Sequence, residues 1–381
     1  TTGDRNVAIG YNALLTEDTG SRSVAVGYQT LANQNFGTNN YNVAVGYEAG
    51  NSVVSGVQNT LIGSLAGDGI TDGANNVAIG YNALSTEATG HGAVAIGAFA
   101  LEVLNAGNTY NTAVGFNAGA IVSTGIQNTI VGAYAGDALT SGSQNVAMGY
   151  LALSTEDTRG YNVAIGSYAL QDLNSAADAY NVAIGYSAAK EMTSGTYNTV
   201  LGAQAMSTGI TTGDYNIAIG YQAGNAMTSG TLNTLVGAFA GDALTTGGNN
   251  VAIGTYALGA EDGDGGNVAV GAGSLMLLNA GGDAYNVAVG FEAGKALSTG
   301  VQNVVMGAFA GDALTTGNQN VAIGYQALGS EDGNGKNIAI GHYALNTQNA
   351  GADAYNTAVG WEAGKLINTG TYNTLIGARS G

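Results

Sequence analysis

The sequence of 381 residues contains no cysteine and no proline, and only two histidines, one tryptophan and eight basic residues. The lack of cysteine excludes disulfides, thiolate chemistry and cysteine-based metal sites. Eight scattered basic residues against 26 acidic ones give a net charge of −18, which excludes a nucleic-acid-binding surface and argues against docking on an anionic membrane. Charged residues make up 9% and hydrophobic residues 45%, a balance unusual for a globular enzyme and too apolar for a disordered chain.

Long apolar runs are also missing, since Gly, Asn, Thr or an acidic residue interrupts every hydrophobic stretch. No segment therefore reaches membrane-spanning length, and we expect no membrane insertion within this chain. The start at Thr1 shows neither an initiator methionine nor a targeting signal, so we interpret the chain as a piece of a longer protein.

A short repeat dominates what is present. Its anchor is Asn6-Val7-Ala8-Ile9-Gly10, and it recurs 22 times at steps of 17 residues, with a minority of 18 or 19. Counting the anchor Asn as position one, position five is Gly in all 22 repeats, and position one is Asn in all but two, at Ser23 and Ala93. The repeats begin at residues 6, 23, 42, 59, 76, 93, 111, 128, 145, 162, 181, 198, 216, 233, 250, 267, 286, 303, 320, 337, 356 and 373.

A unit of 17 residues is too short to bury a core alone, so the units must stack. Positions two to four alternate as in a short strand, position five ends it, and a second short segment such as residues 13–15 follows. We therefore predict an all-β fold, a parallel β-solenoid of 22 coils with about two strands per coil. Residues 1–381 would form a single elongated domain, in which proline is absent because it would break ladder hydrogen bonds.

The coils fall into four types, A to D, repeated about every 70 residues, with one extra C–D pair starting at Asn216 and Asn233. Type A coils begin at 6, 76, 145, 250 and 320, and each is followed by a longer type B coil. Type C coils begin at 42, 111, 181, 216, 286 and 356, and each is followed by a type D coil. In type D coils position three is large instead of Ala: Leu61, Ile130, Val200, Leu235, Val305 and Leu375. We expect this face to be a seam between chains, with the large residues as contacts; the alternative is that it lines the interior of one coil.

The anchor, followed by Tyr-x-Ala-Leu as in Tyr81 to Leu84, resembles the repeats of phage and phage-like tail fibres and the head repeats of YadA-type trimeric autotransporter adhesins. The resemblance covers the whole chain. It implies a left-handed β-roll, assembly as a homotrimer, an extracellular location on a virion tail fibre or a bacterial surface, and attachment to a host glycan or protein receptor. It transfers no binding residue. We expect a structural shaft or head of an attachment fibre, with recognition by exposed type B loops such as residues 33–40 or by a segment outside this chain.

The sequence indicates no catalytic, cofactor-binding or metal-binding residue and no enzyme activity. His91 and His342 lie far apart, without a second imidazole in reach, so a zinc site or catalytic triad is excluded. Glutamates recur at one offset of type A coils, at Glu17, Glu87, Glu156, Glu261 and Glu331, and four are followed by an aspartate: Asp18, Asp157, Asp262 and Asp332. Pairs four coils apart, about 19 Å, cannot share an ion. We expect a solvated acidic edge.

Three other sets of residues lead to predictions about packing. Lys295 and Asp312 share an offset in adjacent coils and are expected to form a surface ion pair. The Asn column is expected to hydrogen-bond along the stack and to satisfy backbone groups at the corners. Tyrosines flank the anchors; corner packing or burial between chains is favoured over stacking on sugars. They are Tyr41, Tyr110, Tyr180, Tyr215, Tyr285 and Tyr355 before type C anchors, and Tyr11, Tyr81, Tyr150 and Tyr325 after type A glycines.

Two further functions remain as alternatives to the fibre. A polysaccharide depolymerase would use a carboxylate pair such as Glu261 and Asp262 in a groove between chains. Separately, the run of residues 261–264 is the best local candidate for a calcium site, but it lacks the full ligand order of a calcium loop. An ice-binding solenoid would need a flat threonine array, and threonine at position two recurs mainly in type D coils.

Overall fold

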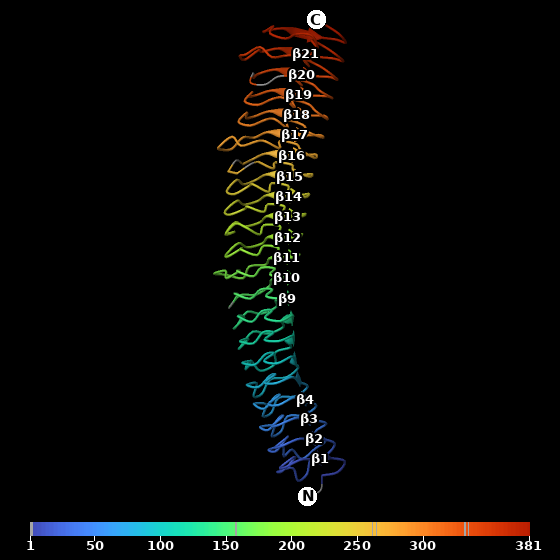
Figure 1. The fold of residues 1–381 in the computed structure, drawn as a ribbon, viewed down its shortest axis with the longest axis vertical. Coiled ribbons are helices and arrows are strands. Elements are labelled where there is room, and N and C mark those ends of the chain that lie inside the picture. The colour runs from blue at the N-terminus through green and yellow to red at the C-terminus, as the bar shows by residue number, and fades with distance from the viewer. Residues whose placement is uncertain (1–2, 157, 261, 264, 331–332, 334) are drawn as a thin grey trace. The chain divides into compact units, whose positions relative to one another are not determined.

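A computed structural model describes residues 3–156, 158–260, 262–263, 265–330, 333 and 335–381. It confirms the predicted fold class, because the described residues form 22 short parallel strands and contain no helix, and hence none that could cross a membrane. The chain divides into two compact units, Thr1–Ser194 and Gly195–Gly381. Each unit is a stack of eleven coils with one strand per coil (Figure 1). The left-handed sense implied by the resemblance stays a prediction.

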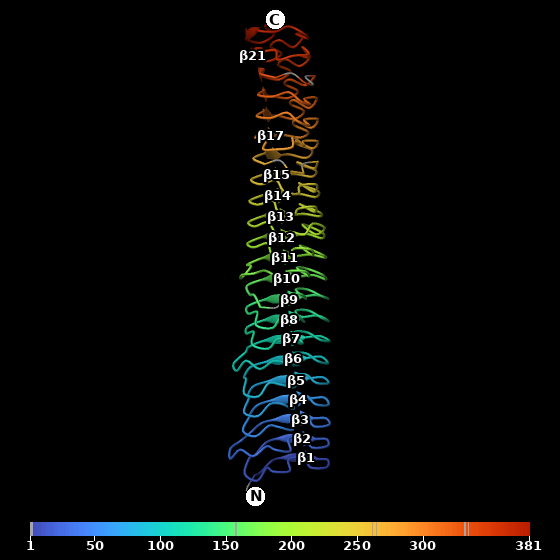
Figure 2. The ribbon, with the colours of Figure 1, turned by 90° about the vertical axis from the view of Figure 1, so that its left-hand side faces the viewer.

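The strands of unit 1 each pair in parallel with the next in chain order, with equivalent repeat positions opposite each other. In Figure 2 they follow one another as a column, with turn segments on both sides. They are β1 (Val7–Ile9), β2 (Val24–Val26), β3 (Val43–Val45), β4 (Thr60–Ile62), β5 (Val77–Ile79), β6 (Val94–Ile96), β7 (Thr112–Val114), β8 (Thr129–Val131), β9 (Val146–Met148), β10 (Val163–Ile165) and β11 (Val182–Ile184).

Unit 2 repeats this arrangement with the same register. Its strands are β12 (Thr199–Leu201), β13 (Ile217–Ile219), β14 (Thr234–Val236), β15 (Val251–Ile253), β16 (Val268–Val270), β17 (Val287–Val289), β18 (Val304–Met306), β19 (Val321–Ile323), β20 (Ile338–Ile340), β21 (Thr357–Val359) and β22 (Thr374–Ile376).

The prediction of about two strands per coil is wrong, because the second short segment is not extended. In the first coil Asn12 and Leu14 have φ angles of +56° and +51°, and these left-handed residues alternate with ordinary ones. The segment still bonds to the next coil, since the Leu14 amide donates to the Thr30 carbonyl at 3.1 Å. It therefore runs as a series of tight corners rather than a pleated strand.

The invariant glycine at position five has a steric cause. Gly63 has a φ of +135°, and a Cβ atom there would lie 2.5 Å from the carbonyl oxygen of Gly80 in the next coil. Only glycine allows successive coils to approach this closely at the corner that ends each strand.

Position three lines the interior of the coil, so the predicted seam between chains on this face is wrong. The strand alanines Ala25, Ala44 and Ala78 are fully buried within the single chain, as is Leu61 of the type D coil. Small residues at position three leave room for leucine at position nine in type A and B coils, for example Leu84. The alternative stated from the sequence, a thin coil interior, is the observed arrangement.

The large residues of type D coils fill space that glycines leave open. Type C and D coils carry glycine at position nine in most repeats, as at Gly50 and Gly67. A Cβ atom on Gly50 would lie 2.5 Å from Leu61 Cδ1 and 2.9 Å from Leu31 Cδ2, and one on Gly67 would lie 2.6 Å from Leu61 Cδ2. One leucine thus packs across its own coil and the coil before it.

The asparagine column joins each coil to the next in the interior. Asn128 is buried, its Oδ1 accepts from the Asn145 amide at 2.9 Å, and its Nδ2 donates to the Gly142 carbonyl at 2.8 Å. The predicted bonding along the stack and at the corners is confirmed, mostly as side-chain-to-backbone bonds. Direct amide-to-amide bonds occur as well, for example from Asn233 Nδ2 to Asn216 Oδ1 at 3.1 Å.

Candidate functional site

The three described type A glutamates, Glu17, Glu87 and Glu156, are half-buried or buried, so the predicted solvated acidic edge is wrong for these three residues. Glu87 is fully buried, and its Oε1 accepts hydrogen bonds from the amides of Thr89 at 3.2 Å and Gly90 at 2.7 Å. Glu17 caps its corner in the same way, and its Oε2 accepts from Gln34 Nε2 at 2.8 Å and from Asn40 Nδ2 at 2.9 Å. Both carboxylates hold the turn at their corner by accepting hydrogen bonds from groups of the chain.

The neighbouring aspartates point the other way. Asp18 is exposed whereas Glu17 is half-buried, and Asp262 is also exposed. Glu156 is fully buried and its Oε1 accepts from the Arg159 amide at 3.1 Å. Glu17 and Asp18 are the one such pair of which both members are described, and Glu17 is held by Gln34 and Asn40, so this pair is not free to act as acid and base on one substrate atom. The remaining members of this column, Asp157, Glu261, Glu331 and Asp332, lie outside the described residues, as does Asp264 of the run of residues 261–264.

The histidines have separate structural contacts. His91 Nδ1 accepts a hydrogen bond from the Ala74 amide at 2.8 Å. The ring of His342 stacks on Tyr325 with centroids 5.1 Å apart and meets Tyr343 edge to face at 4.4 Å. Among the residues that the structure describes, no group of three or more His, Cys, Asp or Glu side chains is arranged to hold a metal ion.

The predicted ion pair between Lys295 and Asp312 is wrong, although the register behind it is right. Lys295 Nζ lies 3.2 Å from Glu292 Oε1 of its own coil. The Ala296 amide donates to the Asp312 carbonyl at 3.2 Å, which confirms that the two coils are in the expected alignment. The charge of Lys295 still acts on Asp312, where it opposes the rise in the pKa of the carboxyl group.

Asp312 belongs to a column of half-buried aspartates in type D coils. Burial raises the pKa of the carboxyl groups of Asp68, Asp137, Asp242 and Asp312 above the ordinary aspartate value. The Oδ1 atoms of Asp68, Asp137 and Asp242 are buried without a hydrogen-bond partner. The charges of Glu48 and Glu292, each in the preceding type C coil, raise the pKa of the Asp68 and Asp312 carboxyl groups further.

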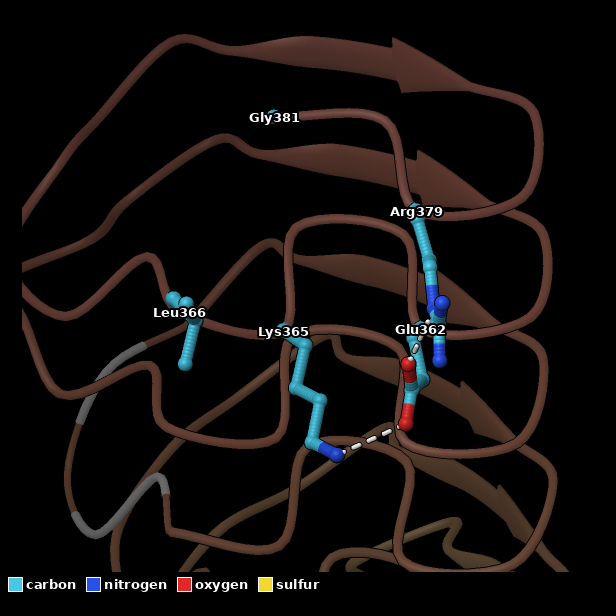
Figure 3. Close-up of a pocket in the computed structure, with 5 residues that line it drawn as sticks. All are labelled: Glu362, Lys365, Leu366, Arg379 and Gly381. Carbon is cyan, nitrogen blue, oxygen red and sulfur yellow. Dashed lines mark hydrogen bonds and ion pairs between the residues drawn. The ribbon is translucent and has the colours of Figure 1, made fainter.

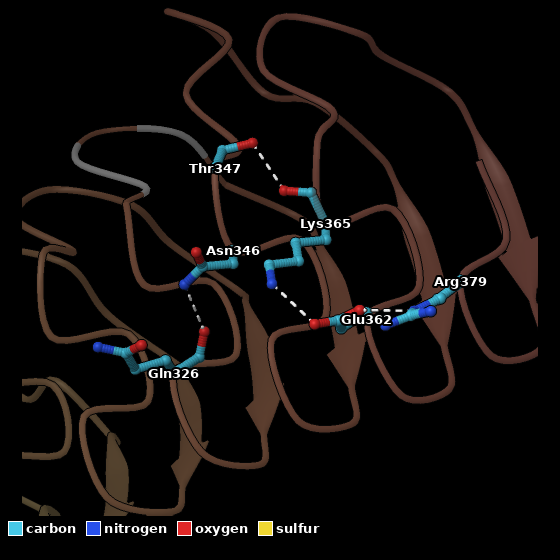
Figure 4. Close-up of polar contacts among 6 residues, drawn as sticks. All are labelled: Gln326, Asn346, Thr347, Glu362, Lys365 and Arg379. Carbon is cyan, nitrogen blue, oxygen red and sulfur yellow. Dashed lines mark hydrogen bonds and ion pairs between the residues drawn. The ribbon is translucent and has the colours of Figure 1, made fainter.

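A pocket of about 340 Å³ lies beside the last coils of unit 2, lined by Glu362, Lys365, Leu366, Arg379 and Gly381 (Figure 3). Glu362 sits between two cations: Lys365 Nζ is 2.7 Å from its Oε1, and Arg379 Nε is 2.9 Å from its Oε2 (Figure 4). These bonds lower the pKa of the Glu362 carboxyl group. The carboxylate is therefore held ionised by its neighbours, and the lining offers no nucleophile or general base.

No protein-family model and no curated protein matches this chain. Its function must therefore be argued from its own surfaces.

The most distinctive surface is the outer side of the strands, which the sequence analysis did not single out. Because position three points inward, positions two and four point outward, and they are half-buried or exposed β-branched residues in most coils. Val45, Ile62 and Ile253 are 37–40% exposed. The signal in the sequence was the alternation itself: once alanine is assigned to the interior, valine and isoleucine must face out.

Type C coils add an aromatic residue at each end of the strand. All twelve are 42–61% exposed: Tyr41, Tyr47, Tyr110, Phe116, Tyr180, Tyr186, Tyr215, Tyr221, Tyr285, Phe291, Tyr355 and Trp361. We call this set, with the outward residues at positions two and four of all coils, the strand face. It presents a broad apolar surface with aromatic groups at its margins.

Many aromatic rings also contact rings of adjacent coils, which confirms the predicted corner packing. In unit 1 a ladder of rings meets edge to face with centroids 5.3–6.3 Å apart. Its members are Tyr81, Phe99, Phe116, Tyr134, Tyr150, Tyr168 and Tyr186. Stacking on sugars stays a hypothesis.

Proposed function

We propose that this chain is a structural segment, shaft or head, of an extracellular attachment fibre, on a virion tail or a bacterial surface. The observation that carries the proposal is the continuity of the coil-to-coil bonding. Within each unit, strand, corner and asparagine column all bond to the next coil, as at Val163 with Val182 and at Asn162 with Asn145. A stack with so little variation between coils suits a segment that spaces and displays other parts of a fibre, rather than an enzyme with one catalytic site.

The polar groups that an enzyme would need are engaged in this architecture. The described type A glutamates hold turns, His91 holds a corner amide, and Glu362 is neutralised by two cations. These engaged groups favour a structural role over the depolymerase alternative, because a general acid or base must reach a substrate proton. Of the pair named for that alternative, Asp262 is exposed and Glu261 lies outside the described residues.

A deletion of one four-coil period tests the structural role. Removing residues 76–144 joins residue 75 to Asn145 in phase and keeps the repeat unbroken within unit 1. We expect the variant to fold with an unchanged melting temperature and to be shorter by about four strand spacings, about 19 Å. Electron microscopy and thermal denaturation measure both. A control that removes residues 76–135 breaks the phase and is expected to unfold locally.

Attachment is tested with beads that carry the full chain, passed under flow over a panel of bacterial cells. The proposal expects retention on at least one surface, and the same retention with the in-phase deletion. Loss of retention with that deletion would locate a unique binding site in residues 76–144 and contradict a purely structural role for these coils. Release of soluble saccharide from purified lipopolysaccharide by the chain would overturn the proposal in favour of an enzyme.

A further inference from the structure

Along one margin of the strand face, tyrosines of adjacent coils stack face to face. The residue before the anchor is tyrosine in nine of the 22 repeats. Three pairs of these rings, each pair within one unit, have ring planes within 14° of parallel. We call them the pre-anchor pairs, and their centroid distances are 4.8 Å for Tyr161–Tyr180, 5.0 Å for Tyr197–Tyr215 and 5.1 Å for Tyr355–Tyr372. All six side chains are 42–75% exposed, so a reagent in solution reaches them.

The position before the anchor carries tyrosine and never phenylalanine. Five of the six phenylalanines instead follow an anchor glycine by one or two residues, and they contact rings of adjacent coils there. They are Phe99, Phe116, Phe239, Phe291 and Phe309. Phenylalanine therefore satisfies ring packing in this architecture. What tyrosine adds before the anchor is the phenol, which gives up an electron and a proton far more easily than a phenyl ring does.

We propose that the pre-anchor pairs are sites of oxidative cross-linking, at which successive coils become joined through dityrosine. The two rings of a pair come from equivalent repeat positions and are parallel, so identical atoms lie side by side, about one coil spacing apart. A turn of the rings about their Cβ–Cγ bonds brings together the ring carbons next to the two phenol oxygens. These are the carbons at which phenoxyl radicals couple.

The reaction balances with hydrogen peroxide as the oxidant and a haem peroxidase as the catalyst. Each of the two phenols loses one electron and one proton and becomes a phenoxyl radical. The radicals join in a carbon–carbon bond, and the hydrogens on the two joined carbons move to the oxygens and restore the phenols. The two electrons and two protons reduce one hydrogen peroxide to two waters.

The link gives this chain a covalent tie that it cannot obtain from disulfides, because it has no cysteine. Each link closes a loop of one coil, since Tyr161 and Tyr180 are 19 residues apart and Tyr197 and Tyr215 are 18 apart. A closed loop restricts the unfolded chain, as a disulfide does. In a stack where each coil contacts only its neighbours, the tie therefore opposes separation of two coils. This modification goes beyond the proposed fibre role and does not depend on attachment.

The test treats the full chain with hydrogen peroxide and a haem peroxidase. Dityrosine is measured by its blue fluorescence and by the loss of two hydrogen atoms per link in the mass of the chain. A neighbouring ring on the same chain has an effective concentration of about millimolar, far above that of a micromolar chain. We therefore expect the yield per chain to stay constant over an about tenfold range of micromolar concentration, in a product that runs as a single chain on a denaturing gel. Cross-linked dimers as the main product would overturn the assignment to pairs within one chain.

Two variants with equal numbers of tyrosines locate the links. Both carry Tyr28→Phe, which interrupts a further parallel stack of Tyr11, Tyr28 and Tyr47. The test variant also replaces one member of each pre-anchor pair by phenylalanine, which keeps the ring and removes the phenol. Its further changes are Tyr161→Phe, Tyr197→Phe and Tyr372→Phe. We expect it to lose most of the dityrosine that the Tyr28→Phe chain forms, with an unchanged circular dichroism spectrum.

The matched control removes tyrosines whose rings meet other tyrosines edge to face, at 85–90°. Its further changes are Tyr150→Phe, Tyr168→Phe and Tyr325→Phe. We expect it to keep the yield of the Tyr28→Phe chain, because an edge-to-face pair does not place equivalent ring carbons side by side. Equal yields from the test variant and the control would overturn the pre-anchor pairs as the sites. Absence of dityrosine from the Tyr28→Phe chain would overturn them as well.

A second measurement tests what the links do. The treated Tyr28→Phe chain is expected to melt at a higher temperature than the untreated chain, whereas treatment should leave the melting temperature of the test variant unchanged. A chain that carries the links and melts at the original temperature would overturn their role in holding coils together. If the links form as expected but no surface retains the beads, the modification would stand and the attachment function would fail.

Discussion

Type C and type D coils are neighbours of nearly equal length that distribute volume in opposite ways. The type C coil that begins at Asn42 places Tyr41 and Tyr47 outside, and it has the small residues Ala44 and Gly50 at positions three and nine inside. The following type D coil has Leu61 inside, and its outer ends carry only glutamine and serine.

The inner difference is resolved within one chain, because the leucine of the D coil fills the space over the glycine of the C coil. The outer difference has no such resolution. Aromatic side chains remain about half exposed in every type C coil. The comparison teaches that the four-coil period serves two tasks, interior packing and the display of a periodic apolar surface.

The largest expected effect comes from removing an interior leucine of a type D coil. Leu235→Ala removes a fully buried side chain that packs over Gly224 and Gly241, and it leaves a cavity between two coils. We expect the free energy of unfolding to fall by about 3 kcal/mol. Denaturant titration measures it.

An exposed aromatic residue of a type C coil supplies the control for that experiment. Tyr221→Ala in the preceding type C coil removes a larger side chain that is 47% exposed, and we expect a change of about 1 kcal/mol or less in the free energy of unfolding. A loss for Tyr221→Ala equal to that for Leu235→Ala would mean that the outer aromatics hold the coil itself together.

The asparagine column is the next target. Asn128→Ala leaves the buried amide of Asn145 and the carbonyl of Gly142 without their partners, at a cost of about 2–4 kcal/mol. The adjacent exposed Gln127→Ala is expected to change stability by about 0.5 kcal/mol or less. Thermal unfolding of the two variants separates interior amides from surface amides, and similar melting temperatures would contradict the structural role of the column.

Exchanging the large and the small residue between positions three and nine tests how type D coils fill their interior. Leu61→Ala and Gly67→Leu together give the pattern of type A and B coils, which have alanine at position three and leucine at position nine. Each single change is destabilising, but the double-mutant cycle should show a favourable coupling of about 1 kcal/mol or more, because the new leucine occupies the vacated space. Simple additivity of the two losses would show that the sites do not share one cavity.

Much of this architecture follows from the sequence, because glycine at position five and alternation at positions two to four leave few other arrangements. Two features did not follow. The inward direction of Glu87 could not be predicted, since its partners are backbone amides whose positions depend on the turn at Gly90. The second segment looked like a strand because its apolar residues are spaced as in one, whereas Leu14 adopts a left-handed conformation that a propensity argument assigns to glycine.

The error about the seam has a related cause. Alternation shows that alanine and valine face opposite sides, but it does not say which side is inside. The glycines at position nine carried that information: a leucine at position three needs an empty partner position, and Gly67 provides it. Coils with leucine at position nine, such as Leu84, have alanine at position three, whereas the coil with Leu61 at position three has glycine at position nine. This exchange of volume identifies position three as interior.

The smallest expected effect concerns the half-buried aspartates, which appear in type D coils and not in type C coils. Burial raises the pKa of Asp137 in the folded chain, so its contribution to stability is complete below the unfolded pKa of about 3.9 and is lost as the pH rises through the folded value. Asp137→Asn removes this titration. We expect the variant to be more stable than the wild type by about 1 kcal/mol or less at pH 7, with the difference vanishing near pH 3.

Chemical denaturation across that pH range measures the difference between Asp137→Asn and the wild type. The type D coil that begins at Asn198 has Ser207 at this offset, so the architecture accepts an uncharged residue there. Asp18→Asn is the control, because it removes one carboxylate that is exposed rather than half-buried. A variant that is less stable than the wild type at pH 7 would mean that the ionised Asp137 makes a favourable contact. Half-buried aspartates would then stabilise type D coils instead of costing them stability at neutral pH.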